Sequence, residues 1–80
     1  MRLGQVSGSV WATKKMEGLL GRALLLVTPE DGGPPFVAVD GLGAGPGDRV
    51  LVTGGSSASL ALGGAPADAL IVGIIDREDR

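Results

Sequence analysis

The sequence contains no cysteine, no histidine and no tyrosine, and its only aromatic side chains are Trp11 and Phe36. Without cysteine there is no disulfide, and without cysteine or histidine a zinc site lacks its usual ligands. Small domains that have no such staple are commonly stabilised by oligomerisation, because 80 residues build only a modest core. These absences are therefore a first indication of self-assembly.

The same absences remove most catalytic side chains. Four of the remaining carboxylates belong to aspartates at the ends of expected strands: Asp40, Asp48, Asp68 and Asp76. Aspartate at such positions commonly binds turn amides. Ser56, Ser57 and Ser59 have no visible base that could activate a nucleophile. The sequence predicts that the protein is not an enzyme and that it holds no metal or cofactor.

The sequence also has little excess of either charge sign, since its formal net charge is −2. Nucleic-acid binding needs clustered Lys and Arg, and this balance argues against it. No apolar run approaches the ~20 residues that a membrane-spanning helix needs. The segment Met1–Gln5 is not followed by the apolar stretch of a signal peptide. We therefore expect a cytoplasmic protein with neither nucleic acid nor a membrane as its partner.

What the sequence does contain is typical of short strands joined by tight turns. Hydrophobic residues, mainly Val, Leu, Ile and Ala, make up 44%, and 15 glycines and five prolines interrupt them. We expect strands at Arg2–Thr13, Arg22–Thr28, Phe36–Asp40, Arg49–Thr53 and Asp68–Asp76. A short helix before the last strand would have Ser56 or Ser57 as its N-cap. The prediction is a single all-β domain over residues 1–80, a small five-stranded OB-like β-barrel with one short helix.

Two of the expected strands carry further information. In the first, alternation places Gly4, Val6, Gly8 and Val10 on one face, and its interior glycines indicate bends or close backbone approach. The second contains the continuous apolar run 23–27, which suggests burial on both faces. In a barrel, the outer face of that strand would have to meet something else, such as a neighbouring subunit.

The segment Gly41–Asp48 is unusually rich in glycine. It fits neither the dinucleotide-binding pattern nor the P-loop pattern, because Pro46 or Asp48 stands at the required sixth position and no Gly-Lys-Ser/Thr follows. A loop without side-chain bulk allows backbones to approach closely, so several copies could meet around a symmetry axis. The alternative is an ordinary loop that needs positive φ angles.

Two binding functions remain as alternatives to a structural role. Lys15-Met16 is similar to the modified lysine of biotinyl and lipoyl carriers, although here it lies near the N-terminus rather than at a mid-chain hairpin. An OB-type binder of single-stranded nucleic acid would need aromatic side chains along a basic groove. Such a small all-β binding module is the second hypothesis.

Four segments, in order, resemble the vertex proteins of bacterial microcompartments, the EutN/CcmL-type family. The most specific runs from Val37 to Val52: an apolar strand, Asp40, the sequence Gly-Ala-Gly-x-Gly-acid, and another apolar strand. The other three are Gly4–Lys14, Gly55–Ala58 and Pro66–Asp76. The sequence departs from the family at Ser59 and Ala65, where an arginine is common.

The resemblance implies a fold and a task. Members of this family are small β-barrels that assemble as pentameric rings, and each ring fills a fivefold vertex of a shell otherwise tiled by hexameric proteins. This chain would then be a structural homo-oligomer in the shell of a carboxysome-like or catabolic microcompartment. Gly43, Ala44 and Gly45 are the first candidates for the fivefold axis and its pore, and Ser56 and Ser57 are the second.

Overall fold

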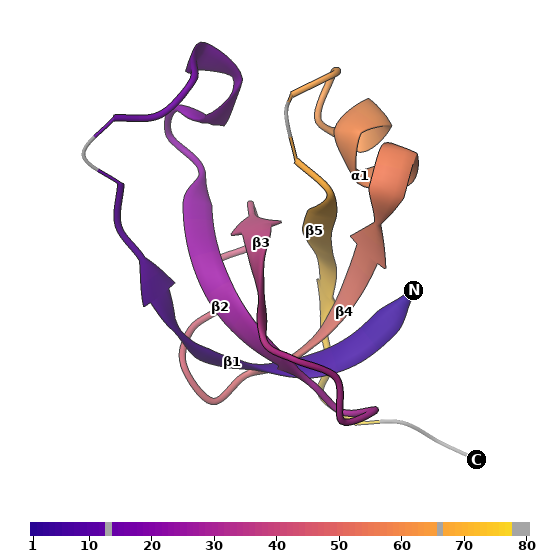
Figure 1. The fold of residues 1–80 in the computed structure, drawn as a ribbon. Coiled ribbons are helices and arrows are strands. Elements are labelled where there is room, and N and C mark those ends of the chain that lie inside the picture. Colours follow the sequence, from indigo (N-terminus) through magenta and orange to yellow (C-terminus); the bar gives the residue numbers. More distant parts are fainter. Residues whose placement is uncertain (13, 66, 78–80) are drawn as a thin grey trace.

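The structure of the protein is a computed structural model that describes residues 1–12, 14–65 and 67–77. Its strands are β1 (Arg2–Val10), β2 (Ala23–Pro29), β3 (Phe36–Asp40), β4 (Arg49–Gly54) and β5 (Ala69–Ile74). A 3-10 turn, η1 (Glu17–Leu19), lies between β1 and β2, and the helix α1 (Gly55–Ala61) lies between β4 and β5. The predicted all-β fold with one short helix is confirmed (Figure 1).

The strands form a closed barrel in the order β1-β2-β3-β5-β4. Long β1 closes it by pairing with both β4 and β2, and these ladders are antiparallel. The only parallel ladder among the described residues joins β3 to β5, and its register contains just two pairs, Val39 with Leu70 and Asp40 with Ile71. The first half of β3 therefore has no strand partner on the β5 side.

The core of the barrel consists of small aliphatic side chains. Its buried members are Val6, Leu25, Val27, Ala38, Val50, Val52, Ala69 and Ile71. Phe36 and Ala44, both partly buried, pack against this cluster. A Cβ atom at Gly4 would lie 2.6 Å from Cγ1 of Val27, so the glycine allows β1 to approach β2 closely. Because this core is small, many of the other hydrophobic side chains lie on the outside of the barrel.

The first strand differs from its prediction in length and in alternation. It ends at Val10 rather than at Thr13, and Thr13 lies outside the described residues. The register with β2 shifts between Val6 and Gly8, which is a β-bulge. Because a bulge adds one residue to one strand, the side chains after it change faces. Val10 consequently pairs with Leu24 on the outer face, and the predicted single face from Gly4 to Val10 is wrong.

Candidate functional site

Asp40 organises the glycine-rich loop that follows β3. Its side chain is buried, with 4% of the residue exposed. Its Oδ1 accepts a hydrogen bond from the amide of Leu42 at 3.1 Å, and its Oδ2 accepts from the amides of Gly43 at 3.1 Å and Ala44 at 3.0 Å. The prediction that this aspartate binds turn amides is confirmed, and one carboxylate fixes three consecutive residues of the loop.

Asp48 closes the other end of the same loop. Its Oδ2 accepts a hydrogen bond from the amide of Gly45 at 2.8 Å. The loop is also tied to β1, because the amide of Val6 donates to the carbonyl of Asp48 at 2.9 Å and the amide of Gly47 donates to the carbonyl of Val6 at 2.8 Å. The segment 41–48 is therefore held at both ends and along its length by the barrel.

This hydrogen bonding decides what the loop can present to a partner. The amides of residues 42–45 donate to the loop's own carboxylates, so they are not directed at a bound phosphate. Gly43 has a φ of 86°, and a Cβ atom at Gly45 would meet no atom within 4 Å. Ala44 is half-buried against the core. The loop thus offers a fixed, low-bulk surface built of backbone.

The two candidate serines lie at the start of α1, and both are exposed. The N-cap of α1 is Gly54 and not Ser56 or Ser57, so that prediction is wrong. The physical reason is the extended conformation that Gly54 adopts where β4 ends. Gly55 follows as the first residue of α1 with a φ of 60°, in the left-handed region that glycine tolerates. Both serine hydroxyls therefore belong to the first turn of the helix itself.

The two groups of candidate residues do not form one cluster in the protomer. The loop that contains Gly43, Ala44 and Gly45 precedes β4, whereas Ser56 and Ser57 follow it. Six residues in a strand span about 20 Å. Figure 1 shows α1 beyond the arrowhead of β4, away from the loop between β3 and β4. A fivefold axis that lies close to both groups would therefore have to run roughly parallel to β4.

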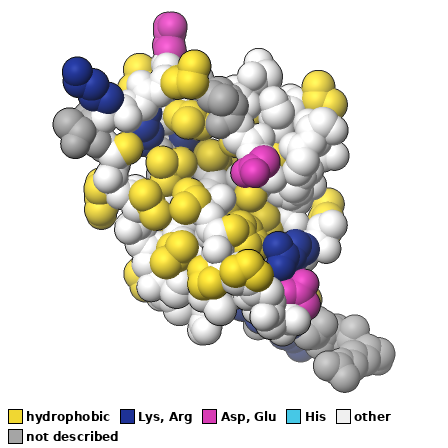
Figure 2. Space-filling view, in the orientation of Figure 1, with side chains coloured by type: hydrophobic (Ala, Val, Ile, Leu, Met, Phe, Trp, Pro, Cys, Tyr) yellow, Lys and Arg dark blue, Asp and Glu magenta, His cyan; other side chains and the backbone are white. Residues whose placement is uncertain are grey.

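Apolar side chains cover a large part of the outer surface. On β2, the inward residues Leu25 and Val27 are buried, while Leu24 and Leu26 face outward and are half-buried. Val37 on β3 and Val72 on β5 are 42% and 40% exposed. Figure 2 shows hydrophobic side chains gathered on the face where β2 and β3 lie. Exposed apolar surface of this kind is typical of protein–protein interfaces, and the expectation that the outer face of the run 23–27 meets a neighbouring subunit stays a prediction.

Two ion pairs that the sequence did not suggest brace the turn between β2 and β3. Arg49 donates two hydrogen bonds to the carboxylate of Glu30, including Nη2 to Oε1 at 2.8 Å. Arg2 donates from Nη2 to Oδ1 of Asp31 at 3.1 Å, and its guanidinium lies 4.9 Å from the ring centre of Phe36. These hydrogen bonds lower the pKa values of Glu30 and Asp31. No local sequence pattern indicates such pairs, because the partners lie 19 and 29 positions apart in the chain.

The side chain of Lys15 is used within the protomer. Its Nζ donates a hydrogen bond to the carbonyl of Arg22 at 2.7 Å, and the residue is half-buried. The modified lysine of a carrier domain must instead reach a partner enzyme freely. Among residues 1–12, 14–65 and 67–77, no group of three or more acidic side chains could hold a metal ion. No described helix is long and apolar enough to cross a membrane.

Comparison with known proteins gives a match over almost the whole chain. The family described as "Ethanolamine utilisation protein EutN/carboxysome" matches residues 1–76. The carboxysome shell vertex protein CsoS4A of Hydrogenovibrio crunogenus is 42% identical over 79 residues, which cover 96% of this chain and 88% of that protein. The microcompartment shell vertex protein PduN of Salmonella typhimurium is 42% identical over 87 residues, which cover 95% and 96%.

A solved structure extends the match to three dimensions. The pentameric shell protein of the RMM microcompartment superposes with a TM-score of 0.89 at 43% identity, and the match covers 100% of this chain and 96% of that one. Family, sequence and fold thus agree along the barrel, the glycine loop and α1. The chain belongs to the EutN/CcmL family.

Proposed function

We propose that this protein is a structural shell protein, five copies of which form a ring that caps a fivefold vertex of a bacterial microcompartment. The observation that carries the proposal is the match to vertex proteins over nearly the full chain, together with the superposition on a pentameric shell protein. The exposed apolar surface of the barrel supports it, because a lone copy would leave that surface in water.

The role we propose is assembly rather than catalysis. The relatives are named for their place in a shell and not for a reaction. The best-buried carboxylate, Asp40, is occupied by three backbone amides of its own loop, which suits a structural group better than a proton carrier. The protein would act in the shell of a microcompartment in the cytoplasm, with hexameric shell proteins as its neighbours.

The glycine loop is the part of the protomer that we place closest to the fivefold axis. Gly43 and Gly45 carry no side chain, and the loop is rigid because Asp40 and Asp48 hold it. Five copies of a fixed, low-bulk loop can converge without a clash. Ser56 and Ser57 would face the same axis only if it runs along β4, and they would then line the pore at the other end of the ring.

Co-expression with hexameric shell proteins tests this function. We expect closed polyhedral shells by electron microscopy when the chain is present, and open sheets, tubes or shells with vacant vertices when it is omitted. The tagged chain should copurify with the shells in a substoichiometric amount, since vertices are few. Closed shells of unchanged shape in its absence, with no incorporation of the chain when it is present, would contradict the proposal.

A further inference from the structure

In the single protomer, the side chain of Trp11 is exposed to solvent. It follows the last residue of β1, is 92% exposed, and is the only tryptophan in the sequence. A tryptophan side chain gains a large free energy on burial, and tryptophan is enriched among the residues that dominate interfaces. An indole in this position, on a barrel with an otherwise well-buried core, indicates an anchor for a partner.

A hollow at the opposite end of β1 has the chemistry to receive an indole. It has a volume of about 440 Å³, and its lining includes Arg2, Phe36, Val52, Ser57, Asp68 and Ala69. The aliphatic and aromatic walls suit the body of the ring, and the Arg2 guanidinium supplies a cation for its face. A buried indole N–H needs an acceptor, and the Ser57 hydroxyl and the Asp68 carboxylate lie in the lining.

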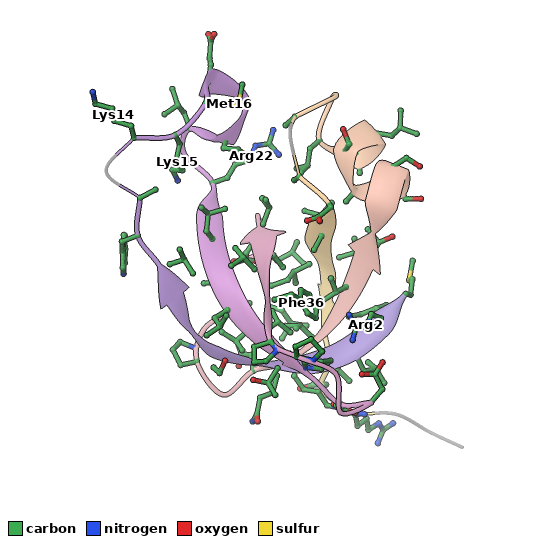
Figure 3. All side chains as sticks on the ribbon, viewed as in Figure 1. Arg2, Lys14, Lys15, Met16, Arg22 and Phe36 are labelled. Carbon is green, nitrogen blue, oxygen red and sulfur yellow. The ribbon has the colours of Figure 1, made fainter. Side chains whose placement is uncertain are left out.

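Trp11 cannot fill the hollow of its own protomer. Arg2 begins β1 and Trp11 follows its end, so the nine residues of the strand separate them by about 30 Å. Figure 3 shows Arg2 and Phe36 low on the barrel and the loop with Lys14, Lys15 and Met16 at its upper left. A contact between two such different surfaces is heterologous, and repetition of a heterologous contact generates a ring when the rotation closes.

Charge favours the same pairing. The loop after Trp11 carries Lys14, Lys15 and Arg22 against the single acidic residue Glu17. The rest of the chain is acidic, since the net charge of the whole is −2. Asp68 is exposed at the hollow. A basic loop on one copy and a carboxylate at the receiving surface of the next attract one another and favour the head-to-tail orientation.

We propose that Trp11 of one copy inserts into the Arg2–Phe36 hollow of the next copy and is the anchor of the ring interface. The proposal rests on the proposed function, because it assigns a contact within that ring. It places the basic loop 14–22 of the first copy beside Asp68 of the second. The partner is thus another copy of this chain and not a hexameric neighbour in the shell.

The lone tryptophan makes the contact measurable in the unmodified protein. We expect the ring to show blue-shifted indole emission and weak quenching by acrylamide, and dilution into monomers should reverse both. Trp11→Ala should raise the protein concentration below which the ring dissociates by at least about tenfold. Trp11→Phe should retain most of the association, because it keeps an aromatic ring. Leu60→Ala is the matched control, because Leu60 is 77% exposed on α1 and belongs neither to the basic loop nor to the lining of the hollow, and it should change the dissociation little.

A disulfide tests the geometry directly, since the chain has no cysteine of its own. Ala12→Cys with Ser57→Cys retains Trp11 and places one thiol beside the anchor and the other in the hollow. Oxidation should give a covalent ladder up to five chains, about 40 kDa from five copies of 8.0 kDa, while either single variant should give no species larger than a dimer. Rings in which acrylamide fully quenches the Trp11 emission, and which give no covalent ladder, would overturn this contact but leave the proposed function intact. A chain that forms no ring would overturn both.

Discussion

Arg49, the first residue of β4, holds Glu30, the residue directly after β2, by two hydrogen bonds from its guanidinium. The next residue, Asp31, is held in the same way by Arg2 on β1. Two consecutive carboxylates of one turn are thus tied to two neighbouring strands of the barrel. The turn that leads into β3, and with it the position of Phe36 beneath Arg2, is fixed by these pairs.

The two ion pairs predict how stability changes in acid. The hydrogen bonds from Arg49 and Arg2 lower the pKa of Glu30 below 4.5 and that of Asp31 below 3.8. A carboxyl group whose pKa is lower in the folded state contributes stability above its unfolded pKa, and this contribution is lost as the pH falls through the folded value. We expect the thermal midpoint to be flat above pH 4.5 and to fall below it.

The double variant Glu30→Gln/Asp31→Asn provides the control for this dependence. It should have a lower midpoint than the parent near neutral pH and a flatter profile in acid, when both are measured at one protomer concentration. The effect should be modest, because both pairs are exposed and solvent screens them. Parallel profiles for parent and variant would show that other carboxylates are responsible for acid sensitivity.

Removal of the Asp40 carboxylate should loosen the glycine loop. Asp40→Ala deprives the amides of Leu42, Gly43 and Ala44 of their acceptor. We expect a loss of about 1.5–3 kcal/mol in the free energy of unfolding and faster hydrogen exchange at those amides. Asp76→Ala, at an exposed position, should cost less than about 0.5 kcal/mol. Equal effects of the two substitutions would refute the role assigned to Asp40.

The two interior glycines of β1 should respond differently to substitution. In Gly4→Ala, the new Cβ would lie 2.6 Å from Cγ1 of Val27 and 2.9 Å from the carbonyl oxygen of Thr28, so β1 and β2 would have to separate. Overpacking of this kind typically costs about 1–3 kcal/mol. Gly8→Ala meets no atom within 4 Å and should be close to neutral. Chemical denaturation of both variants checks the difference.

Enlargement of Gly45 tests whether the loop lies at the axis. A Cβ atom there meets nothing within 4 Å in the protomer and its φ is not positive, so Gly45→Leu should leave the barrel folded. Five leucines converging at an axis would clash, and we expect at least about a tenfold loss of the pentamer. Gly41→Leu, at a similarly open position, is the control. A normal pentamer with Gly45→Leu would move the axis away from this loop.

The strands were predictable because alternation and turn residues act locally. β3 matches its predicted bounds, and β2, β4 and β5 differ from theirs by at most two residues at either end. The bulge in β1 was not predictable, since it depends on the register that β2 imposes across the barrel. The same holds for the cap at Gly54, where the end of β4 rather than the nearest serine sets the helix start.

The candidate site also contains some features that local sequence predicts and others that depend on long-range contacts. Asp40 and Asp48 could be expected to bind turn amides, because they flank the glycine segment in the sequence. The pairs Arg49–Glu30 and Arg2–Asp31 join residues 19 and 29 positions apart, so only the folded barrel brings them together. The separation of the Gly43–Gly45 loop from Ser56 and Ser57, in contrast, follows from a strand that was expected from the sequence, because β4 lies between the two groups.

The central claim is that this chain forms a closed ring of five. Native mass spectrometry of the purified protein tests it most directly, since one chain has a mass of 8.0 kDa and five have a mass of 40 kDa. We predict a dominant species at 40 kDa that releases single chains on activation. A dominant 8.0 kDa monomer, or a ring with another number of copies, would contradict the account.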